Sequence, residues 1–251
     1  MSAFARVMTP NGPRFARADG DGWLVLSEAP WLSLEETGER VADATLLAPV
    51  TPSKIICVGR NYVAHAKELG HDVPKEPLLF FKPPSSIIGP GDAIVLPPAS
   101  EKVDHEAELG VVIGTRCRDV ERDRAMSVIF GYTCVNDVTA RDLQKKDGQW
   151  ARAKGFDTFC PVGPRIVTKL DPQSLRVVCR VDGATRQDGE TKDMIFPVAE
   201  LVSYISRIFT LEPGDLIVTG TPEGVGKLDA GSTVVVEIDG IGALENRVTN
   251  P

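Results

Sequence analysis

The sequence predicts a predominantly β protein with a few short helices, in the α+β class. Short runs of β-branched residues recur along the chain and are separated by Gly, Asp, Asn and Pro turn signals. The runs at 233–238 and 244–248, on either side of Asp239-Gly240, form one such predicted hairpin. By contrast, the apolar positions of 198–208 keep a helical period behind Pro197, which is favoured at the first helical position.

The chain is long enough for one large domain with a small appendage, at 251 residues. Residues 1–50 are predicted to be a small N-terminal module of β-hairpins, because alternating segments and turn signals follow each other closely there. Pro49 and Pro52 mark a boundary before a strand at 55–58. We therefore expect a second domain over residues 51–251.

Composition and charge argue against several classes of partner. The net charge of −7 argues against nucleic acid, whose backbone needs a basic footprint. No apolar run approaches the roughly 18 residues that cross a bilayer, and the first residues lack the apolar core of a signal peptide. The five cysteines are scattered without a Cys-x-x-Cys pair, which indicates reduced thiols and no zinc site. We therefore expect a soluble cytoplasmic protein with neither a membrane nor a nucleic acid as partner.

The most informative stretch is 104–110, which runs into the apolar residues 111–113. It is predicted to be a strand, and alternate residues of a strand share a face. Glu106 and Glu108 would then point the same way, about 6.6 Å apart along the strand. Two like charges there are costly without a cation, which favours a metal site; a solvated strand face is the alternative. Asp137, at the end of a predicted buried strand, would supply a third carboxylate.

A short helix is predicted over residues 62–69, with Asn61 as its N-cap and Gly70 as its C-cap. His65 and Glu68 lie three residues apart and therefore share one face of this helix. A histidine held by a carboxylate is a common general base near neutral pH. A surface His–Glu pair without a catalytic role is the alternative.

Three further segments are weaker signals. His71 is predicted to lie in a loop, with no role. Lys82 ends an apolar strand that two prolines stop, which suits either a cation at the rim of the core or a snorkelling lysine. The glycine-rich segment 220–226 could hold an anion with its backbone N–H groups or form a plain turn. It matches neither a dinucleotide-binding fingerprint nor a P-loop.

Six segments in this order carry a resemblance to a known family. They are Gly59-Arg60-Asn61-Tyr62 with His65 and Glu68, Phe81-Lys82-Pro83, the strand with Glu106 and Glu108, Asn136-Asp137 with Arg141 and Gln144, Lys154-Gly155-Phe156-Asp157, and the loop from Thr219 to Gly226. Together they resemble the fumarylacetoacetate hydrolase family over roughly residues 53–248. The resemblance implies mixed β-sheets rolled around the site, a small N-terminal β module, a catalytic domain over 51–251 and a homodimer.

The resemblance also implies roles for individual residues. The ligands of one Mg²⁺ or Mn²⁺ per chain would be Glu106, Glu108 and Asp137, and three hard oxygen ligands suit those ions. His65 and Glu68 would form an acid–base pair on a lid helix that becomes ordered when substrate binds. The residues expected around the bound keto acid are Arg60, Lys82, Gln144, Lys154 and Thr221. Lys154 would also act in catalysis, by stabilising enolate charge.

The enzyme that gives the family its name has an additional metal-binding carboxylate upstream, and no such residue precedes Glu106 here. The chain resembles instead the shorter bacterial and mitochondrial members. The first expectation is a hydrolase that cleaves a C–C bond of an acylpyruvate-type 2,4-diketo acid through an enolate held at the metal. The alternatives are an oxaloacetate decarboxylase or tautomerase, and a 2-hydroxyhepta-2,4-diene-1,7-dioate isomerase/decarboxylase of aromatic catabolism. A catalytically silent metal-binding protein is the alternative outside enzymology.

Overall fold

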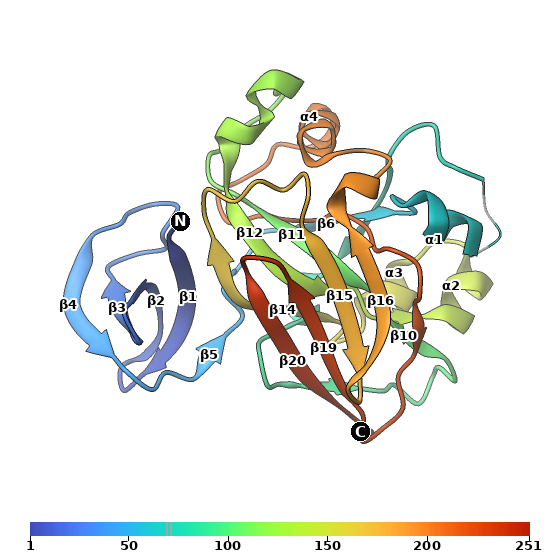
Figure 1. Ribbon diagram of the computed structural model, residues 1–251, viewed down its shortest axis with the longest axis horizontal. Coiled ribbons are helices and arrows are strands. Elements are labelled where there is room, and N and C mark those ends of the chain that lie inside the picture. Colours follow the sequence, from blue (N-terminus) through green and yellow to red (C-terminus); the bar gives the residue numbers. More distant parts are fainter. Residues whose placement is uncertain (69, 71) are drawn as a thin grey trace.

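The computed structural model describes residues 1–68, 70 and 72–251, and it is built mainly of β-strands (Figure 1). The described strands form a twelve-stranded, a five-stranded and a three-stranded sheet, joined by short helices. Most neighbouring strands are antiparallel, but three pairs are parallel. The predicted α+β class with mixed sheets is confirmed.

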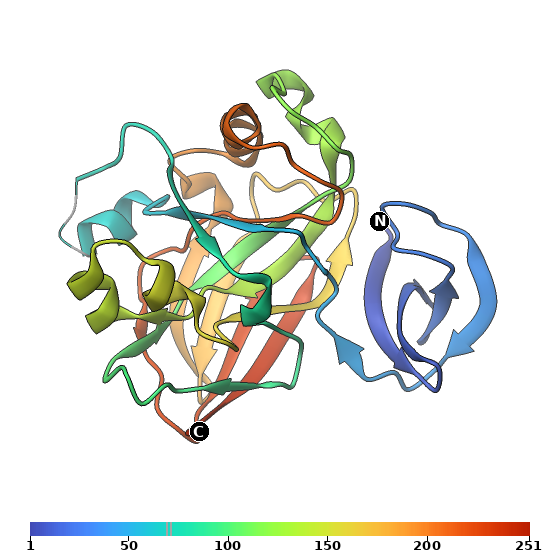
Figure 2. The same cartoon turned by 180° about the vertical axis from the view of Figure 1, so that it is seen from behind.

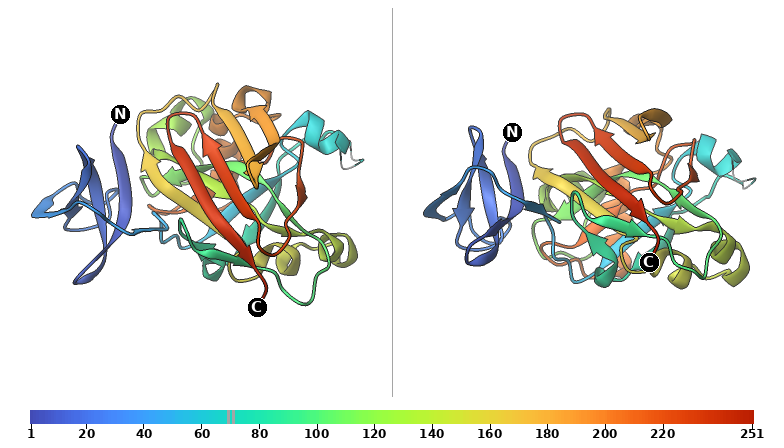
Figure 3. Two further views of the ribbon diagram at one scale, coloured as in Figure 1. Left: turned by 60° about the horizontal axis from the view of Figure 1, so that its bottom comes forward. Right: turned by 90° about the horizontal axis from the view of Figure 1, so that it is seen from below.

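The N-terminal strands form a meander at one side of the molecule (Figures 1 and 3). They are β1 (Ala3–Thr9), β2 (Gly12–Asp19), β3 (Gly22–Leu26) and β4 (Glu36–Val41), with β5 (Leu46–Leu47) paired to β1. Because β1 also pairs with β14 (Cys160–Val167), these strands extend the largest sheet rather than form a sheet of their own. A small cluster of buried Ala5, Val7 and Ala16 packs among them. The division of the chain at residue 50 stays a prediction.

The rest of the largest sheet places the strand that contains Glu108 at its centre. Beyond β14 it continues with β12 (Ile129–Asn136), β11 (Ala107–Ile113), β17 (Leu216–Val218), β6 (Ile55–Gly59) and β7 (Leu78–Lys82). Every residue of β11 is buried. Its nearly continuous apolar sequence fits this burial, because a strand that is covered on both faces has no solvent-facing positions that require polar residues. The short β8 (Ile87–Ile88) pairs with β14.

The five-stranded sheet packs across β11 and β12 and encloses the main core. Its order is β16 (Ala184–Glu190), β15 (Arg176–Val181), β19 (Thr233–Ile238), β20 (Gly242–Thr249) and β9 (Ala93–Val95). The core joins apolar residues of both layers, such as Leu109 and Val111 of β11 with Val177 and Val236. The three-stranded sheet, β13 (Thr139–Ala140), β10 (Val103–His105) and β18 (Gly226–Lys227), lies where β10 leads into β11.

Helices are short apart from one. The α-helices are α1 (Val63–Glu68), α2 (Arg141–Asp147), α3 (Ala151–Gly155) and α4 (Val198–Ile208), and the 3₁₀ helices are η1 (Pro84–Ser86), η2 (Arg122–Val128) and η3 (Thr191–Asp193). The helix predicted behind Pro197 is confirmed as α4. Helices α1, α2 and α3 gather at the side of the molecule away from the N-terminal strands (Figures 1 and 2). No helix in the described residues is long and apolar enough to cross a membrane.

The helix predicted over 62–69 is present as α1, but the assignment of its N-cap is wrong. Asn61 uses its side-chain amide across the chain: Nδ2 donates to the carbonyls of Phe196 and Thr219, and Oδ1 accepts from the Phe196 N–H. Gly70 has a φ of +72°, the left-handed conformation typical of a helix end. Leu69, the predicted last helical residue, and His71 lie outside the described residues.

Candidate metal centre and active site

Two neighbouring strands bring three carboxylates together. Glu106 lies between β10 and β11, Glu108 lies within β11, and Asp137 directly follows β12. The two strands pair so that Ala107 lies opposite Asn136. The Asp137 N–H therefore reaches the Glu106 carbonyl, to which it donates at 2.8 Å. Carboxylate oxygens of the three acidic residues lie within 4.8 Å of one another, and all three residues are buried.

The residue before Glu106 faces the opposite side of the strand, as alternation predicts. His105 Nδ1 lies 3.0 Å from the side-chain oxygen of Gln187, which can only accept. Burial lowers the pKa of this imidazole. A neutral ring with its proton on Nδ1 fits both observations. His105 is therefore part of the support behind the site and is not one of its ligands.

Three cations surround two of the carboxylates. Lys154 Nζ donates to Glu106 Oε2 and to Asp137 Oδ2, at 2.7 Å in each case. Arg141 Nη2 donates to Glu106 Oε1, and Lys82 Nζ donates to Asp137 Oδ1 at 2.6 Å. Burial alone would raise the pKa of Glu106, but Arg141 and Lys154 outweigh it and hold that pKa well below its usual 4.5. Glu106 is therefore ionised and fixed in position.

Glu108 has different surroundings. It forms no ion pair with any residue that the structure describes, and its Oε2 accepts a hydrogen bond from the Gly220 N–H. Burial first, and then the negative charges of Asp137 and Glu106, raise the pKa of Glu108 well above its usual 4.5. A nearby cation would reverse this, because an opposite charge favours the ionised carboxylate.

The donor set fits a hard divalent cation. In the described part of the chain the buried or nearly buried charged groups at this point are four carboxylates and three cations, namely Asp104, Glu106, Glu108 and Asp137 with Lys82, Arg141 and Lys154. One negative charge is therefore left without a partner, and the oxygen ligands are of the kind that Mg²⁺ and Mn²⁺ prefer. A divalent ion would give the cluster a net positive charge, which favours an anionic substrate.

The three carboxylates open onto a cavity of about 1190 Å³. The predicted site residues that line it are Arg60, His65, Glu68, Glu106, Glu108, Asp137, Gln144, Lys154 and Thr221. Helices α1, α2 and α3 each supply side chains that line this cavity. The fold thus brings residues that are up to 161 positions apart in the sequence to the wall of one cavity.

Lys82 is the exception among the predicted site residues. It is not among the described residues that line the cavity, and none of its side chain is exposed. Its Nζ lies behind Asp137 and also donates to the Val138 carbonyl at 3.1 Å. In this structure Lys82 fixes and neutralises Asp137, and the expectation that Lys82 contacts the keto acid stays a prediction.

The predicted His65–Glu68 pair is present on α1. His65 Nδ1 lies 3.2 Å from Glu68 Oε2, and His65 is almost fully buried at the cavity. Glu68 Oε1 in turn accepts from the Gly224 N–H at 3.1 Å. Gly224 has a φ of +92°, and a Cβ there would lie 2.1 Å from the Arg186 carbonyl, so the loop needs glycine at this position.

The glycine-rich loop therefore holds carboxylates of the protein itself. The Gly220 N–H binds the Glu108 carboxylate and the Gly224 N–H binds that of Glu68. The Thr221 hydroxyl donates to the Ala107 carbonyl at 2.8 Å and accepts from Gln187 Nε2 at 2.7 Å. The loop thus ties the helix that contains His65 to the strand that contains Glu108.

Sequence reasoning gave no role to Asp104, Arg141 and Gln187. Arg141 Nε donates to Asp104 Oδ2 at 2.9 Å, and its Nη1 donates to the Gln144 oxygen at 2.9 Å. Gln187 Oε1 accepts from the Ala107 N–H at 3.0 Å, which secures the start of β11. Arg141 lies within a segment that carries the family resemblance, which could have drawn attention to it. Gln187 lies in a polar strand and gives no such signal.

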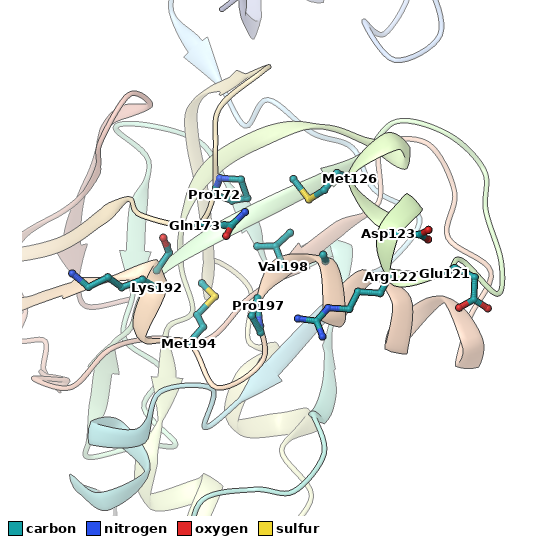
Figure 4. Close-up of a pocket in the computed structure, with 12 residues that line it drawn as sticks. Glu121, Arg122, Asp123, Met126, Pro172, Gln173, Lys192, Met194, Pro197 and Val198 are labelled. Carbon is teal, nitrogen blue, oxygen red and sulfur yellow. The ribbon is translucent and has the colours of Figure 1, made fainter.

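A second cavity, of about 810 Å³, lies elsewhere and contains none of the predicted residues (Figure 4). Its walls come from η2, η3, the start of α4 and the loop before β15. Met126, Met194 and Val198 contribute apolar surface there, beside the charged Arg122 and Lys192. Among the residues that the structure describes, none lines both cavities.

Comparison with known families identifies the class of protein. Residues 54–249 match the family described as fumarylacetoacetate (FAA) hydrolase, C-terminal, and residues 3–49 match the one described as Rv2993c-like, N-terminal. The chain therefore belongs to the fumarylacetoacetate hydrolase family, whose members include hydrolases, isomerases and tautomerases.

Individual relatives differ in their named activities. The chain is 47% identical to the human mitochondrial oxaloacetate tautomerase FAHD2A over 220 residues. This match covers 82% of this chain and 70% of the relative. It resembles the crystal structure of 2-hydroxyhepta-2,4-diene-1,7-dioate isomerase from Mycobacterium marinum, with a TM-score of 0.93, 44% identity and coverage of 100% and 99% of the two chains. It also resembles fumarylpyruvate hydrolase from Pseudomonas aeruginosa in complex with Mn²⁺ and pyruvate, with a TM-score of 0.76, 36% identity and coverage of 84% and 93%.

Proposed function

We propose that this protein is an Mg²⁺- or Mn²⁺-dependent enzyme acting on small 2-oxo or 2-enol carboxylates, and that its leading reaction is hydrolysis of a C–C bond in an acylpyruvate-type 2,4-dioxo acid. The observation that carries the proposal is the shared cavity: a buried triad of carboxylates and a His–Glu pair both open onto it. A structural metal site has no need of the second feature.

The ligands of the ion would be Glu106, Glu108 and Asp137. A bound divalent ion would supply Lewis-acid polarisation of the carboxylate and 2-oxygen of the substrate. Lys154 would stabilise the negative charge that develops there. Burial alone would lower its pKa, but Asp137 and Glu106 outweigh burial and raise it, so the ammonium is retained.

His65 is the proposed general base. Its Nδ1 faces Glu68, so Nδ1–H can donate to that carboxylate and Nε2 is left to accept a proton. In hydrolysis a water molecule gives a proton to Nε2 and its oxygen bonds to the distal carbonyl carbon. The C–C bond then breaks, its electron pair goes to the pyruvate fragment, and the products are a carboxylic acid and the enolate of pyruvate. Protonated His65 returns its proton to this enolate and so gives pyruvate.

Keto–enol isomerisation is the second candidate, because two of the relatives described above are named as a tautomerase and an isomerase. In that reaction His65 moves a proton between carbon and oxygen of the substrate, and no water attacks. Arg60, Gln144 and Thr221 would line the bound substrate in either reaction. Decarboxylation of oxaloacetate would need no attacking water either.

Proton NMR with acetylpyruvate and Mg²⁺, against an EDTA control, tests the proposal. Acetate and pyruvate that appear together, only with metal, support C–C hydrolysis. If acetylpyruvate remains intact, the protein does not hydrolyse this compound. Oxaloacetate is then tested for tautomerisation and CO₂ release. The variant His65→Ala should lose turnover by about 10²-fold or more while Mn²⁺ binding, followed by EPR, is kept. Loss of Mn²⁺ binding, or an unchanged rate, would contradict the role of His65.

Two further expectations, the homodimer from the family resemblance and the division of the chain from its sequence pattern, complete the proposal. We propose that the chain forms a homodimer, which light scattering during size-exclusion chromatography tests. We also propose that residues 1–50 and 51–251 are separate units of the fold. Limited proteolysis between them, with the larger fragment remaining folded by circular dichroism, would support that division.

A further inference from the structure

An aromatic wall leads along the catalytic cavity away from the carboxylates. Lys154 Nζ lies 4.9 Å from the centroid of the Phe80 ring. Trp150 packs edge-on against Phe80, with centroids 5.2 Å apart, and the Arg60 guanidinium carbon lies 5.8 Å from the Trp150 ring. Arg60 is therefore separated from Lys154 by two aromatic rings, and all four residues line the cavity.

Arg60 differs from the other arginine of the cavity in having no anionic partner. Arg141 is paired with Asp104 and Glu106. Arg60 is half-buried and forms no hydrogen bond or ion pair with any residue that the structure describes. Burial lowers the pKa of this guanidinium. A cation that is partly removed from water without a counter-charge is unfavourable, and an anionic ligand relieves that cost.

The position of Arg60 is fixed by its neighbours. Its φ is +56°, a left-handed conformation that non-glycine residues adopt rarely and that is often found at functional sites. Trp150 can approach the chain here because the preceding residue is Gly59, where a Cβ would lie 2.8 Å from the indole ring. The guanidinium is thus held against a flat ring at the cavity wall, an arrangement that preorganises it for a planar anion.

We propose that Arg60, held against Trp150, binds a second carboxylate at the far end of the substrate and selects 2-oxo or 2-enol dicarboxylates with several carbons between their acid groups. This rests on the proposed function, which places the first carboxylate at the triad and Lys154. The carbon chain would then lie along Phe80 and Trp150. Lys102 and Lys145 also line the cavity, but both are exposed and can remain solvated.

A matched pair of substrates tests this assignment. The pair is 2,4-dioxoheptanedioate and the same compound with a terminal carboxamide, which differ only in the distal charge. In the presence of Mn²⁺ the wild-type protein should prefer the dicarboxylate by about 10- to 100-fold in kcat/KM, as expected for a charge-assisted hydrogen bond. Arg60→Gln should bring this ratio close to one, and Arg60→Lys should retain part of it. Trp150→Leu should lower the ratio, since the guanidinium is no longer held.

Lys145→Gln is the control, because it removes an exposed cation from the same cavity and should leave the ratio unchanged. A wild-type ratio near one, a ratio that survives Arg60→Gln, or a ratio that collapses in Lys145→Gln would each overturn the assignment. If neither compound is turned over, the proposed function fails, and calorimetric Kd values for the same pair still report the role of Arg60. Turnover without a preference for the dicarboxylate overturns the role of Arg60 alone.

Discussion

The two sides of the carboxylate site differ although they carry the same residue type. Glu106 is bound by Arg141 and Lys154, whereas Glu108 has a backbone N–H group and no ion pair with any described residue. The pKa of Glu106 is accordingly held below its usual value, and that of Glu108 is raised well above it. Glu106 is fixed by its ion pairs, whereas ionised Glu108 would need a nearby cation to be stable. A site can thus be rigid and still attract a cation strongly.

The largest change in the free energy of unfolding is expected when Glu106, the carboxylate with two cationic partners, is removed. Glu106→Ala leaves Arg141 and Lys154 without their shared buried partner, so we expect the free energy of unfolding to fall by about 3–5 kcal/mol. Binding of Mn²⁺ should be lost as well. Urea unfolding in EDTA and EPR titration with Mn²⁺ measure the two effects. A variant as stable as the wild type would contradict the comparison.

Substitution of Glu108 should change the stability of the metal-free protein in the opposite direction. Glu108→Gln removes a buried carboxyl group whose ionisation is unfavourable without a cation, so in EDTA at neutral pH the variant should be more stable than the wild type by about 1 kcal/mol or more. Its affinity for Mn²⁺ should fall at least about tenfold, because the number of charged ligands sets affinity. If Glu108→Gln destabilises the metal-free protein as much as Glu106→Gln does, the two sides are equivalent and the comparison fails.

The pH dependence sharpens the same contrast. The folded-state pKa of Glu108 lies above its usual 4.5, so the folded protein binds the proton more tightly than the unfolded chain does. Its contribution to stability is therefore present below pH 4.5 and is lost as the pH rises through the folded-state pKa. Glu106 has the reverse sign, and its contribution is lost as the pH falls below 4.5 toward its lower folded-state pKa.

Urea unfolding in EDTA from pH 4.5 upward measures this contribution. The stability advantage of Glu108→Gln over the wild type should grow with pH across that range and shrink toward zero near pH 4.5. An advantage that is independent of pH would show that Glu108 does not titrate in this way.

The smallest change in the free energy of unfolding is expected for a solvent-exposed ion pair. Arg17 pairs with Glu36 between β2 and β4, where both side chains are more than a third exposed. Arg17→Ala should change the free energy of unfolding by less than about 1 kcal/mol, because solvent already screens the pair. Urea unfolding provides the measurement. A loss comparable to that of Glu106→Ala would mean that burial does not account for the strength of the pairs at the site.

Much of the site could be predicted because its signals are local. Strand alternation placed Glu106 and Glu108 on one face and His105 on the other, and helical spacing paired His65 with Glu68. Local spacing does not say how far a side chain lies from solvent. The sequence left open whether Lys82 lies at the rim of the core or snorkels to solvent, and the packing of β7 beside β6 buries it against Asp137.

The sequence by itself determined the strands, the one long helix and the short-range residue pairs, because periodicity and turn residues act over a few positions. Only the tertiary structure decided which charges are neutralised and which are not. Arg60 and Trp150 meet across 90 positions, and Gln187 reaches Thr221 and the start of β11 from a separate sheet. The electrostatics of a buried site depend on every charge within a few ångströms, and those distances exist only once the sheets have packed.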